Sequence, residues 1–439
     1  MAPPPRAQRP FDVCVFGASG FTGARVAEEL AAQCAAAGLR AALAGRDEGK
    51  LRALAGKLPN GGDLGIVAGV DVSDPASVER LVGCCRLLLN CVGPYRFYGE
   101  PVFGAAAAAG TDYLDLCGEP EFIERMELAY AQPAAASGAL MACASAFDSI
   151  PNDLGTILVA REFRPPAVPS SVESVIRVSA PLGLPIHFAT WESAVHGIGS
   201  AQHLQRVRAE AKKAGRGKAP KLVGPRPRGA QGPVWDAALG AYTLPFPGAD
   251  ASVVRRTQMA LGARGEPAVH FSARFAVATR YYAAVAVVVG ATLMTLAKHG
   301  WGRALLLRNP GLMSYGLVSH AGPTQEQMEA ATTEVTFVAR GFSAPPESAD
   351  AKPDKRVDLK IGLGDPGYLY TAKMMVAAAM ALVEERAKVL ESVGGSGGVF
   401  TAGFLLRDTS LPERLKRAGM TFEFKHDEAG APAAAEAAA

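Results

Sequence analysis

The sequence predicts an α/β protein with an N-terminal doubly wound parallel sheet and a second, α+β domain. Three observations lead to this prediction. Short apolar runs alternate with helical stretches through the first 155 residues, a glycine-rich turn follows the first run directly, and the pattern changes after residue 155. Strands that alternate with helices are typical of parallel sheets covered on both faces. The 439 residues are enough for two or three domains.

Six apolar runs are predicted to be the strands of the first sheet. They cover residues 11–18, 39–45, 64–72, 86–93, 111–116 and 139–145. Helical stretches lie between most of them, notably over 76–85 and 100–110. We therefore predict one domain over residues 11–155.

The second domain is predicted over residues 156–365. Its segments are interrupted by proline and alternate polar with apolar residues, which is typical of antiparallel strands. Within it, residues 205–229 carry nine Lys or Arg and one Glu. Their proline and glycine content predicts a basic loop rather than a stable helix.

The remaining segments lie at the two ends of the chain. Residues 366–390 are predicted to form one long helix that returns to complete the first domain, followed by a C-terminal segment over 391–425. Residues 1–10 lack the apolar stretch of a secretion signal and are expected to be flexible. The alanine-rich tail, 426–439, is expected to be disordered.

The turn after the first predicted strand has the spacing GxxGxxG. Small residues permit close backbone approach to a pyrophosphate, and free N–H groups at the start of the next helix attract phosphate. Because the turn lies between a predicted strand and a predicted helix, we expect a Rossmann-like domain that binds a dinucleotide. The residues expected to hold the cofactor here are Gly17, Ser19, Gly20, Phe21, Thr22 and Gly23.

The residues after the second strand bear on which dinucleotide is bound. Arg46 can pair with the 2′-phosphate of NADP, whereas Asp47 can accept a hydrogen bond from the ribose of NAD. The sequence favours NADP and leaves NAD open. Further cofactor contacts, expected from their positions in later loops, are Asp71, Asn90, Gly93 and Pro94.

Several motifs resemble those of the saccharopine dehydrogenase-like oxidoreductases. In the first domain they are VFGASGFTG, LLNCVGPYRFYGEPV, the Gly118-Glu119-Pro120 turn and FDSIPNDLG. Farther along they are IHFATWESAVHG, LVGP, SVVRRTQ, GPT and GGVFTAG, so the resemblance spans residues 10–425. It implies a Rossmann domain, a substrate or dimerisation domain, binding of NAD(P) and self-association. The chain more distantly resembles mycobacterial trans-acting enoyl reductases, which suggests a lipid-linked substrate.

Hydride transfer to C=O, C=N or C=C needs an accompanying proton. The candidate donors are Tyr95, Tyr98, Asp148 and His187, with Glu119 and Ser149 as further candidates by position. Other roles stay open: the tyrosines can pack, Asp148 and Asp153 can cap the next helix, and His187 can lie in a domain interface. The sequence has no HExxH, GxSxG or zinc-ligand cluster, so we expect neither a metalloenzyme nor a hydrolase.

An uncharged, apolar stretch over residues 281–297 lies between Arg280 and Lys298. It is marginal for a transmembrane helix, which needs about 20 apolar residues. The alternatives are peripheral or monotopic attachment, a buried or dimer-interface helix, and a span. We expect attachment to a membrane or lipid-droplet surface that faces the cytosol, with a cytoplasmic protein as the alternative. The basic loop 205–229 would add attraction to anionic lipid.

The composition limits the remaining possibilities. A net charge of +3 provides no global field for nucleic acid, and the seven cysteines include no CxxC pair and are expected to be reduced. We therefore hypothesise an NAD(P)-dependent oxidoreductase that acts on an apolar substrate of lipid or glycolipid metabolism, assembled as a homo-oligomer. The alternatives are a non-catalytic lipid-droplet-associated protein with the same fold and a soluble amino-acid dehydrogenase of the saccharopine type.

Overall fold

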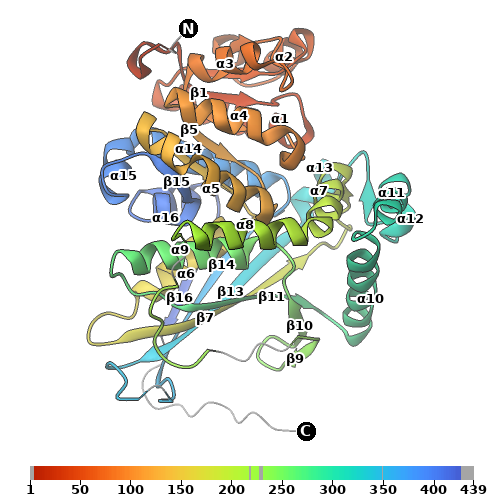
Figure 1. Ribbon diagram of the computed structural model, residues 1–439. Helices are drawn as coiled ribbons and strands as arrows, with labels where there is room; N and C mark the ends of the chain where they lie inside the picture. Colours follow the sequence, from red (N-terminus) through yellow and green to blue (C-terminus); the bar gives the residue numbers. More distant parts are fainter. Residues whose placement is uncertain (1–3, 217–218, 227–230, 349, 427–439) are drawn as a thin grey trace.

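The computed structural model describes residues 4–216, 219–226, 231–348 and 350–426. Two seven-stranded sheets dominate it, the first in the upper part of Figure 1 and the second in the lower part. Some residues predicted to be flexible, disordered or part of the basic loop lie outside the described residues. They are 1–3, 217–218, 227–229 and 427–439.

The first sheet is entirely parallel and confirms the predicted doubly wound architecture. Its strand order is β3-β2-β1-β4-β5-β6-β15, the order of dinucleotide-binding folds with one strand added at the end. The strands are β1 (Phe11–Phe16), β2 (Ala41–Ala44), β3 (Gly65–Val67), β4 (Cys85–Asn90), β5 (Asp112–Asp115), β6 (Leu140–Cys143) and β15 (Gly398–Thr401). Each of the six predicted strands is present, whereas β15 was not predicted.

Alternate residues of these strands face two layers of helices. Val13 and Val15 of β1 join a core with α1 and α14, whereas Cys14 and Phe16 join a second core with α3, α4 and α5. The helices that flank the sheet are α1 (Phe21–Ala37), α2 (Glu48–Ala55), α3 (Pro75–Cys84), α4 (Tyr95–Ala109), α5 (Pro120–Ser137) and α14 (Leu369–Glu384). The short 3-10 helices are Arg6–Gln8 and Gly61–Asp63.

The second sheet is mixed and has the order β16-β14-β13-β7-β11-β10-β9. Only β7 and β11 pair in parallel in this sheet, so the predicted antiparallel character holds for the other pairs. Its strands are β7 (Val168–Ser179), β9 (Val234–Asp236), β10 (Ala241–Pro245), β11 (His270–Val277), β13 (Thr332–Phe342), β14 (Lys355–Leu363) and β16 (Thr421–His426). A small parallel pair joins β8 (Ile186–His187) to β12 (Val318–Ser319).

The two sheets share one core through α6 (Ile150–Arg161). Leu154 and Ile157 of α6 belong to the same buried cluster as Phe337 of β13 and Val15 of β1. Helices α9, α16 and α17 also lie near this junction. The remaining helices are α7 (Phe188–Gly199), α8 (Ala201–Lys213), α9 (Asp250–Ala263), α13 (Gln325–Ala330), α15 (Arg386–Ser392), α16 (Ala402–Leu406) and α17 (Leu411–Arg417).

The single long helix predicted over 366–390 is in fact two helices. The chain leaves helical geometry at Glu385, between α14 and α15. The carboxylate of Glu385 accepts a hydrogen bond from the backbone N–H of Ser410 at 2.9 Å. The bend also allows Arg386 to reach Asp112, at 2.9 Å, beneath the first sheet. These long-range contacts outweigh the local helix propensity.

The basic loop predicted over 205–229 is wrong in its first part, because residues up to Lys213 belong to helix α8. Arg208 forms an ion pair with Glu124 of α5 at 2.6 Å, and Val207 is buried. Docking on α5 therefore holds a helix that the composition alone did not favour. The described residues that follow, 214–216 and 219–226, contain neither helix nor strand.

The apolar stretch at 281–297 forms α10 (Arg280–Leu296), which is followed by α11 (Gly300–Arg308) and α12 (Pro310–Met313). These three helices stand at the periphery of the molecule, to the right in Figure 1. Among the described residues, no helix has the length and apolar character needed to cross a membrane. The seven cysteines are free thiols.

Candidate functional site

The candidate site lies where the strand order of the first sheet reverses, between β1 and β4. Ligands of open parallel sheets bind in the crevice at the carboxyl ends of the strands at this switch point. The glycine-rich turn follows β1, and the loop Cys91–Pro94 follows β4. The two loops touch, because a Cβ added to Gly17 would lie 2.8 Å from Cγ2 of Val92.

The glycine-rich turn is too tight for other residues at two of its positions. Gly17 has a φ of +80°, a left-handed conformation that favours glycine. A Cβ added to Gly23 would lie 2.1 Å from the carbonyl oxygen of Gly17. Ser19 and Gly20 are exposed at the tip of the turn. The turn thus offers bare backbone to a ligand.

The start of α1 has no side-chain cap. Gly20 is its N-cap residue, and the first turn contains no acidic side chain. By contrast, Asp47 caps α2 by accepting from the N–H of Lys50 at 3.0 Å, and Asp74 caps α3 by accepting from the N–H of Ala76 at 3.1 Å. The first N–H groups of α1, from Phe21 to Gly23, therefore suit a phosphate group.

Arg46 and Asp71 lie at the ends of the neighbouring strands β2 and β3. Arg46 is exposed, and within the described part of the chain its guanidinium has no hydrogen-bond or ion-pair partner. Asp71 accepts hydrogen bonds from the hydroxyl of Ser73 at 2.6 Å and from its N–H at 2.9 Å, and these bonds lower the pKa of Asp71. The guanidinium of Arg46 therefore faces solvent without a hydrogen bond or ion pair among the described residues, although its charge also contributes to the lowered pKa of Asp71.

The loop after β4 is held rigidly by buried polar groups. The side chain of Asn90 donates to the hydroxyl of Tyr113 at 2.9 Å and accepts from the N–H of Val92 at 3.0 Å. Tyr95 is buried, and its hydroxyl donates to the carbonyl of Asn90 at 2.7 Å. Asn90 and Tyr95 thus shape the loop through Gly93 and Pro94. Tyr98 is exposed on α4 and takes no part in this network.

Phe21 and His187 join the turn to the second domain. Their rings stack at 4.7 Å, and the ring of Tyr368 meets Phe21 edge-on at 4.9 Å. His187 also caps α7, because its Nδ1 accepts from the N–H of Ala189 at 3.2 Å. Burial lowers the pKa of His187. His187 therefore has the interface role that the sequence left open.

Asp148 lies in the connection between the carboxyl end of β6 and the start of α6. Its side chain reaches solvent, yet the dense protein around it raises the pKa of Asp148 to about 6. Its carboxylate has no hydrogen-bond partner among the described residues, and a Cβ added to Gly118 would lie 3.0 Å from its Oδ2. Of the four predicted proton donors, Asp148 and Tyr98 are exposed and have no hydrogen-bond partner for their side-chain oxygens among the described residues, and of these two only the carboxyl group of Asp148 has a pKa near neutrality.

Two further carboxyl groups next to Asp148 were not predicted as a group. Asp250, at the start of α9, accepts from the side chain of Asn152 at 2.7 Å, and burial raises the pKa of Asp250 to about 8. Asp153 accepts from the N–H of Gly403 at 2.8 Å, and burial raises its pKa to about 6. Because Asp250 lies 98 residues beyond Asn152, no local sequence signal announces this cluster.

Helix α7 closes the side of the site that faces the second domain. Arg96 of α4 pairs with Glu119 at 2.5 Å and donates to the carbonyl of His196 on α7 at 2.7 Å. The exposed ring of Phe97 meets His196 edge-on at 4.9 Å. Among the described residues there is no cluster of side chains that could hold a metal ion. The arrangement therefore suits a dinucleotide and a proton donor.

Known proteins resemble the whole chain in sequence. Residues 13–141 match the model of the saccharopine dehydrogenase NADP binding domain. The human saccharopine dehydrogenase-like oxidoreductase is 36% identical over 94% of this chain and 97% of its own length. A probable mitochondrial saccharopine dehydrogenase-like oxidoreductase of Arabidopsis thaliana is 33% identical over 96% of this chain and 98% of its own length.

More distant relatives carry other names. The lipid droplet localized protein of Caenorhabditis elegans is 29% identical over 95% of this chain and 99% of its own length. A trans-acting enoyl reductase of Mycobacterium ulcerans is 43% identical, over 34% of this chain and 35% of its own length. The solved saccharopine dehydrogenase of Saccharomyces cerevisiae shares the fold, with a TM-score of 0.56, 12% identity and coverage of 95% and 100% of the two chains.

Proposed function

The chain belongs to the saccharopine dehydrogenase-like oxidoreductase family, and on that premise we propose that it transfers hydride between NADP(H) and an apolar, lipid-linked substrate. The observation that carries this proposal is the start of α1. It has no side-chain cap, it is built from glycines that bare its backbone, and it lies at the switch point of the sheet. The match to the NADP binding domain spans this turn.

The described residues fit the cofactor that this family match implies. When bound, NADP(H) supplies or accepts a hydride. The N–H groups of Phe21, Thr22 and Gly23 would hold its pyrophosphate, and the unpaired guanidinium of Arg46 would hold its 2′-phosphate. Asp47, which would serve NAD, is already engaged in capping α2. These two observations favour NADP over NAD.

We assign the accompanying proton to Asp148. A carboxyl group with a pKa of about 6 holds its proton in mildly acidic solution and exchanges it readily near neutral pH. In the reductive direction Asp148 would donate this proton to the substrate, and in the oxidative direction its carboxylate would accept one. The lack of a side chain at Gly118 leaves room for the carboxylate of Asp148, because a Cβ there would lie 3.0 Å from its Oδ2.

The polar groups near α7 favour an apolar substrate over an amino acid. An α-carboxylate needs a free cation, but Arg96 is neutralised by Glu119 at 2.5 Å. On its other side, α7 contacts an apolar surface through the side chain of Trp191. The indole N–H of Trp191 also donates to the carbonyl of Leu306 on α11 at 3.1 Å. The soluble amino-acid dehydrogenase is therefore the less favoured alternative.

A second candidate is a non-catalytic lipid-associated protein that retains the cofactor fold. The name of the nematode relative favours it, since that protein is called lipid droplet localized and aligns over 95% of this chain. For either function we propose a location at a lipid-droplet or membrane surface. The plant relative, named as probably mitochondrial, points to a different location.

Titration of the purified protein with NADPH and NADH, followed by nicotinamide fluorescence, tests the cofactor. We expect tight binding of NADPH and weaker binding of NADH, and failure to bind either would refute the proposal. A screen of long-chain ketones, aldehydes and enoyl thioesters then tests turnover. Asp148→Asn should lower turnover at least about a hundredfold with unchanged NADPH affinity, and exposed Asp63→Asn is the control. NADPH binding without any turnover would favour the non-catalytic candidate.

A further inference from the structure

Helix α10 (Arg280–Leu296) is an apolar helix that the protein does not bury. Its only charged residue is Arg280, at its first position, yet Ala283 is its only fully buried residue. A helix that is apolar around its whole circumference normally lies in a protein core or in a membrane. In α10, valines, tyrosines and Met294 instead face outward, with Val288 56% exposed.

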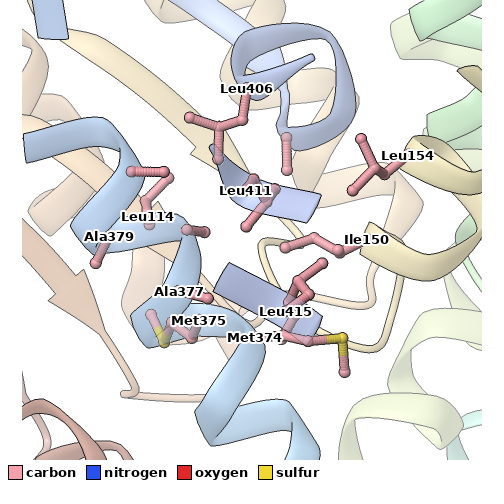
Figure 2. Close-up of a cluster of buried hydrophobic side chains, with 14 of the residues drawn as sticks. Leu114, Ile150, Leu154, Met374, Met375, Ala377, Ala379, Leu406, Leu411 and Leu415 are labelled. Carbon is pink, nitrogen blue, oxygen red and sulfur yellow. The ribbon is translucent and has the colours of Figure 1, made fainter. Parts of the chain in front are cut away.

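Helix α14 (Leu369–Glu384) is the matched case of an apolar helix that is buried. It has nearly the same length, and Figure 2 shows its residues Met374, Met375, Ala377 and Ala379 packed among leucines of other elements. Eleven of its residues are buried. The fold can therefore cover an apolar helix completely, so the exposure of α10 calls for a partner outside the chain.

The exposed apolar surface continues from α10 onto α11, α12 and the residues that lead into β12. Consecutive elements along this path contact one another. Its most exposed large side chains are Tyr281, Tyr282, Val288, Trp301, Leu312, Tyr315 and Leu317. Large exposed apolar patches mark interaction sites. We call this region, residues 280–317, the α10–α12 surface.

The charged residues of the α10–α12 surface itself all have one sign. The sequence contains no Asp or Glu between Glu266 and Glu326, while Arg280, Lys298 and Arg308 are exposed there. Cations beside apolar side chains, with tyrosine and tryptophan among them, are the composition of interfacial membrane-binding segments. A second copy of the same surface would instead bring like charges together without a counter-charge.

We propose that the α10–α12 surface docks the protein on an anionic phospholipid surface. The 17 residues of α10 span about 25 Å at 1.5 Å per residue, less than the roughly 30 Å of a hydrocarbon core. The helix therefore lies within one leaflet or monolayer, with its apolar side chains among the acyl chains. Arg280, Lys298 and Arg308 remain at the level of the phosphates.

Helix α7 connects this surface to the candidate site, and this step rests on the proposed function. Trp191 and Val195 of α7 pack with Ala297 and Leu306 beneath the α10–α12 surface. On the side of the first domain, the carbonyl of His196 accepts from Arg96. Helix α7 thus contacts both the core beneath the α10–α12 surface and the cofactor domain.

Flotation of the full-length protein with phosphatidylcholine vesicles, with and without phosphatidylserine, tests the docking surface. The double variant V288D/L312D should bind at least about tenfold more weakly, because it places acids among the lipids. The variants R280Q, K298Q and R308Q should each weaken binding about fivefold, and only to vesicles with phosphatidylserine. The matched control is F424D, an exposed apolar-to-acid change on β16, at the opposite edge of the second sheet.

Three results would overturn the docking proposal. They are unchanged vesicle binding by V288D/L312D, an equal loss in F424D, and a dimer of the unmodified protein that V288D/L312D dissociates, since a second copy would then cover the surface. Each variant is also titrated with NADPH. Vesicle binding without NADPH binding refutes the proposed function alone, and NADPH binding without vesicle binding refutes the docking proposal alone.

Discussion

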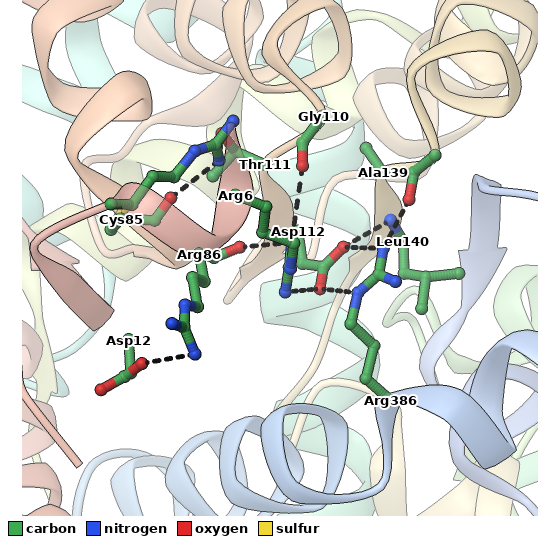
Figure 3. A network of polar contacts seen from close by, with 12 residues as sticks. Arg6, Asp12, Cys85, Arg86, Gly110, Thr111, Asp112, Ala139, Leu140 and Arg386 are labelled. Atoms are coloured by element: carbon green, nitrogen blue, oxygen red, sulfur yellow. Dashed lines mark hydrogen bonds and ion pairs between the residues drawn. The ribbon is translucent and has the colours of Figure 1, made fainter. Parts of the chain in front are cut away.

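The two ends of the first sheet differ in how far their polar side chains are paired. At the amino ends of the strands, Arg6 and Arg386 both pair with the buried carboxylate of Asp112 (Figure 3). Arg9 donates to the carbonyl of Cys85 and to the hydroxyl of Thr111. At the carboxyl ends, the unpaired groups described above face solvent. The comparison indicates that polar groups with protein partners stabilise the fold, whereas polar groups without such partners are available to a ligand.

The amino end shows that a hollow alone does not make a functional site. A hollow of about 540 Å³ lies there, lined by Arg6, Arg9 and Arg386 among others. These cations are engaged, since Arg386 donates to the carbonyl of Gly138 at 2.6 Å and Arg6 to that of Gly110 at 3.4 Å. Both glycines end helices, where cations are stabilising. We therefore infer a structural role for this end.

The largest expected effect is a loss of NADPH affinity on substitution of Gly20, at the carboxyl end of the sheet. Gly20→Val should abolish dinucleotide binding, with at least about a hundredfold loss of NADPH affinity, because its side chain fills the space beside the start of α1. The free energy of unfolding should change little, because Gly20 is exposed and its φ of −76° suits valine. NADPH fluorescence and urea unfolding measure the two quantities. Gly62→Val, at an exposed glycine with open space around it, is the control.

At the amino end we expect the reverse result. Asp112→Ala leaves Arg6 and Arg386 without their shared acceptor and should lower the free energy of unfolding by about 3–5 kcal/mol. NADPH affinity of the folded fraction should not change. The control Glu48→Ala breaks an exposed pair with Arg52 and should lower stability by less than about 1 kcal/mol. Loss of NADPH affinity in Asp112→Ala would end the distinction between the two ends.

How far the sequence predicts the fold depends on how local each signal is. The six strands of the first sheet, their alternation with helices and the glycine-rich turn were predicted from short sequence patterns. The structure confirms all three. Strand β15 was missed because its four residues become a strand only by pairing with β6, more than 250 positions earlier. Glu385 and Arg208 changed the predicted helix and loop through distant partners. Such contacts leave no trace in a sequence window.

The same limit applies to the candidate site. The glycine-rich turn and Arg46 follow directly from their positions after β1 and β2. Asp148 was one of several donor candidates, and only the structure shows that its carboxylate is exposed and unpaired among the described residues, whereas Tyr95 is buried and hydrogen-bonded. Asp250 was not considered as a site residue, because the start of α9 and helix α6 are far apart in the sequence and meet only in the tertiary structure. The glycine-rich turn proposed to hold the cofactor was thus predictable, whereas the proposal of Asp148 as the proton donor needed the tertiary structure.

Arg46 allows a finer test of the carboxyl end. Arg46→Ala should weaken NADPH binding by about 1.5–3 kcal/mol, which corresponds to about 10- to 150-fold, because a charge-assisted contact with the 2′-phosphate is lost. NADH lacks this phosphate, so its affinity should hardly change. Arg52→Ala, an exposed arginine of the adjacent α2, is the control. Equal losses of affinity for NADPH and NADH would show that Arg46 does not bind the 2′-phosphate. Arg46 would then have a structural role, like the arginines at the amino end of the sheet.

The smallest expected effect concerns the sign with which an aspartate contributes to stability at each end. Burial raises the pKa of Asp250 to about 8, whereas the pKa of an unfolded Asp is about 3.9. Between these values the folded state binds more protons, so the free energy of unfolding falls as the pH rises from about 4 to about 8.

Asp250→Asn removes this ionisation, and its amide oxygen can still accept from Asn152. The variant should therefore be about 1–2 kcal/mol more stable than the unmodified protein at pH 8 and show a flatter pH dependence in urea unfolding. Asp112→Ala should destabilise the protein at the same pH, so two buried aspartates, one near each end of the first sheet, would contribute to stability with opposite signs. A loss of stability in Asp250→Asn at pH 8 would mean that the carboxyl end is as well satisfied as the amino end.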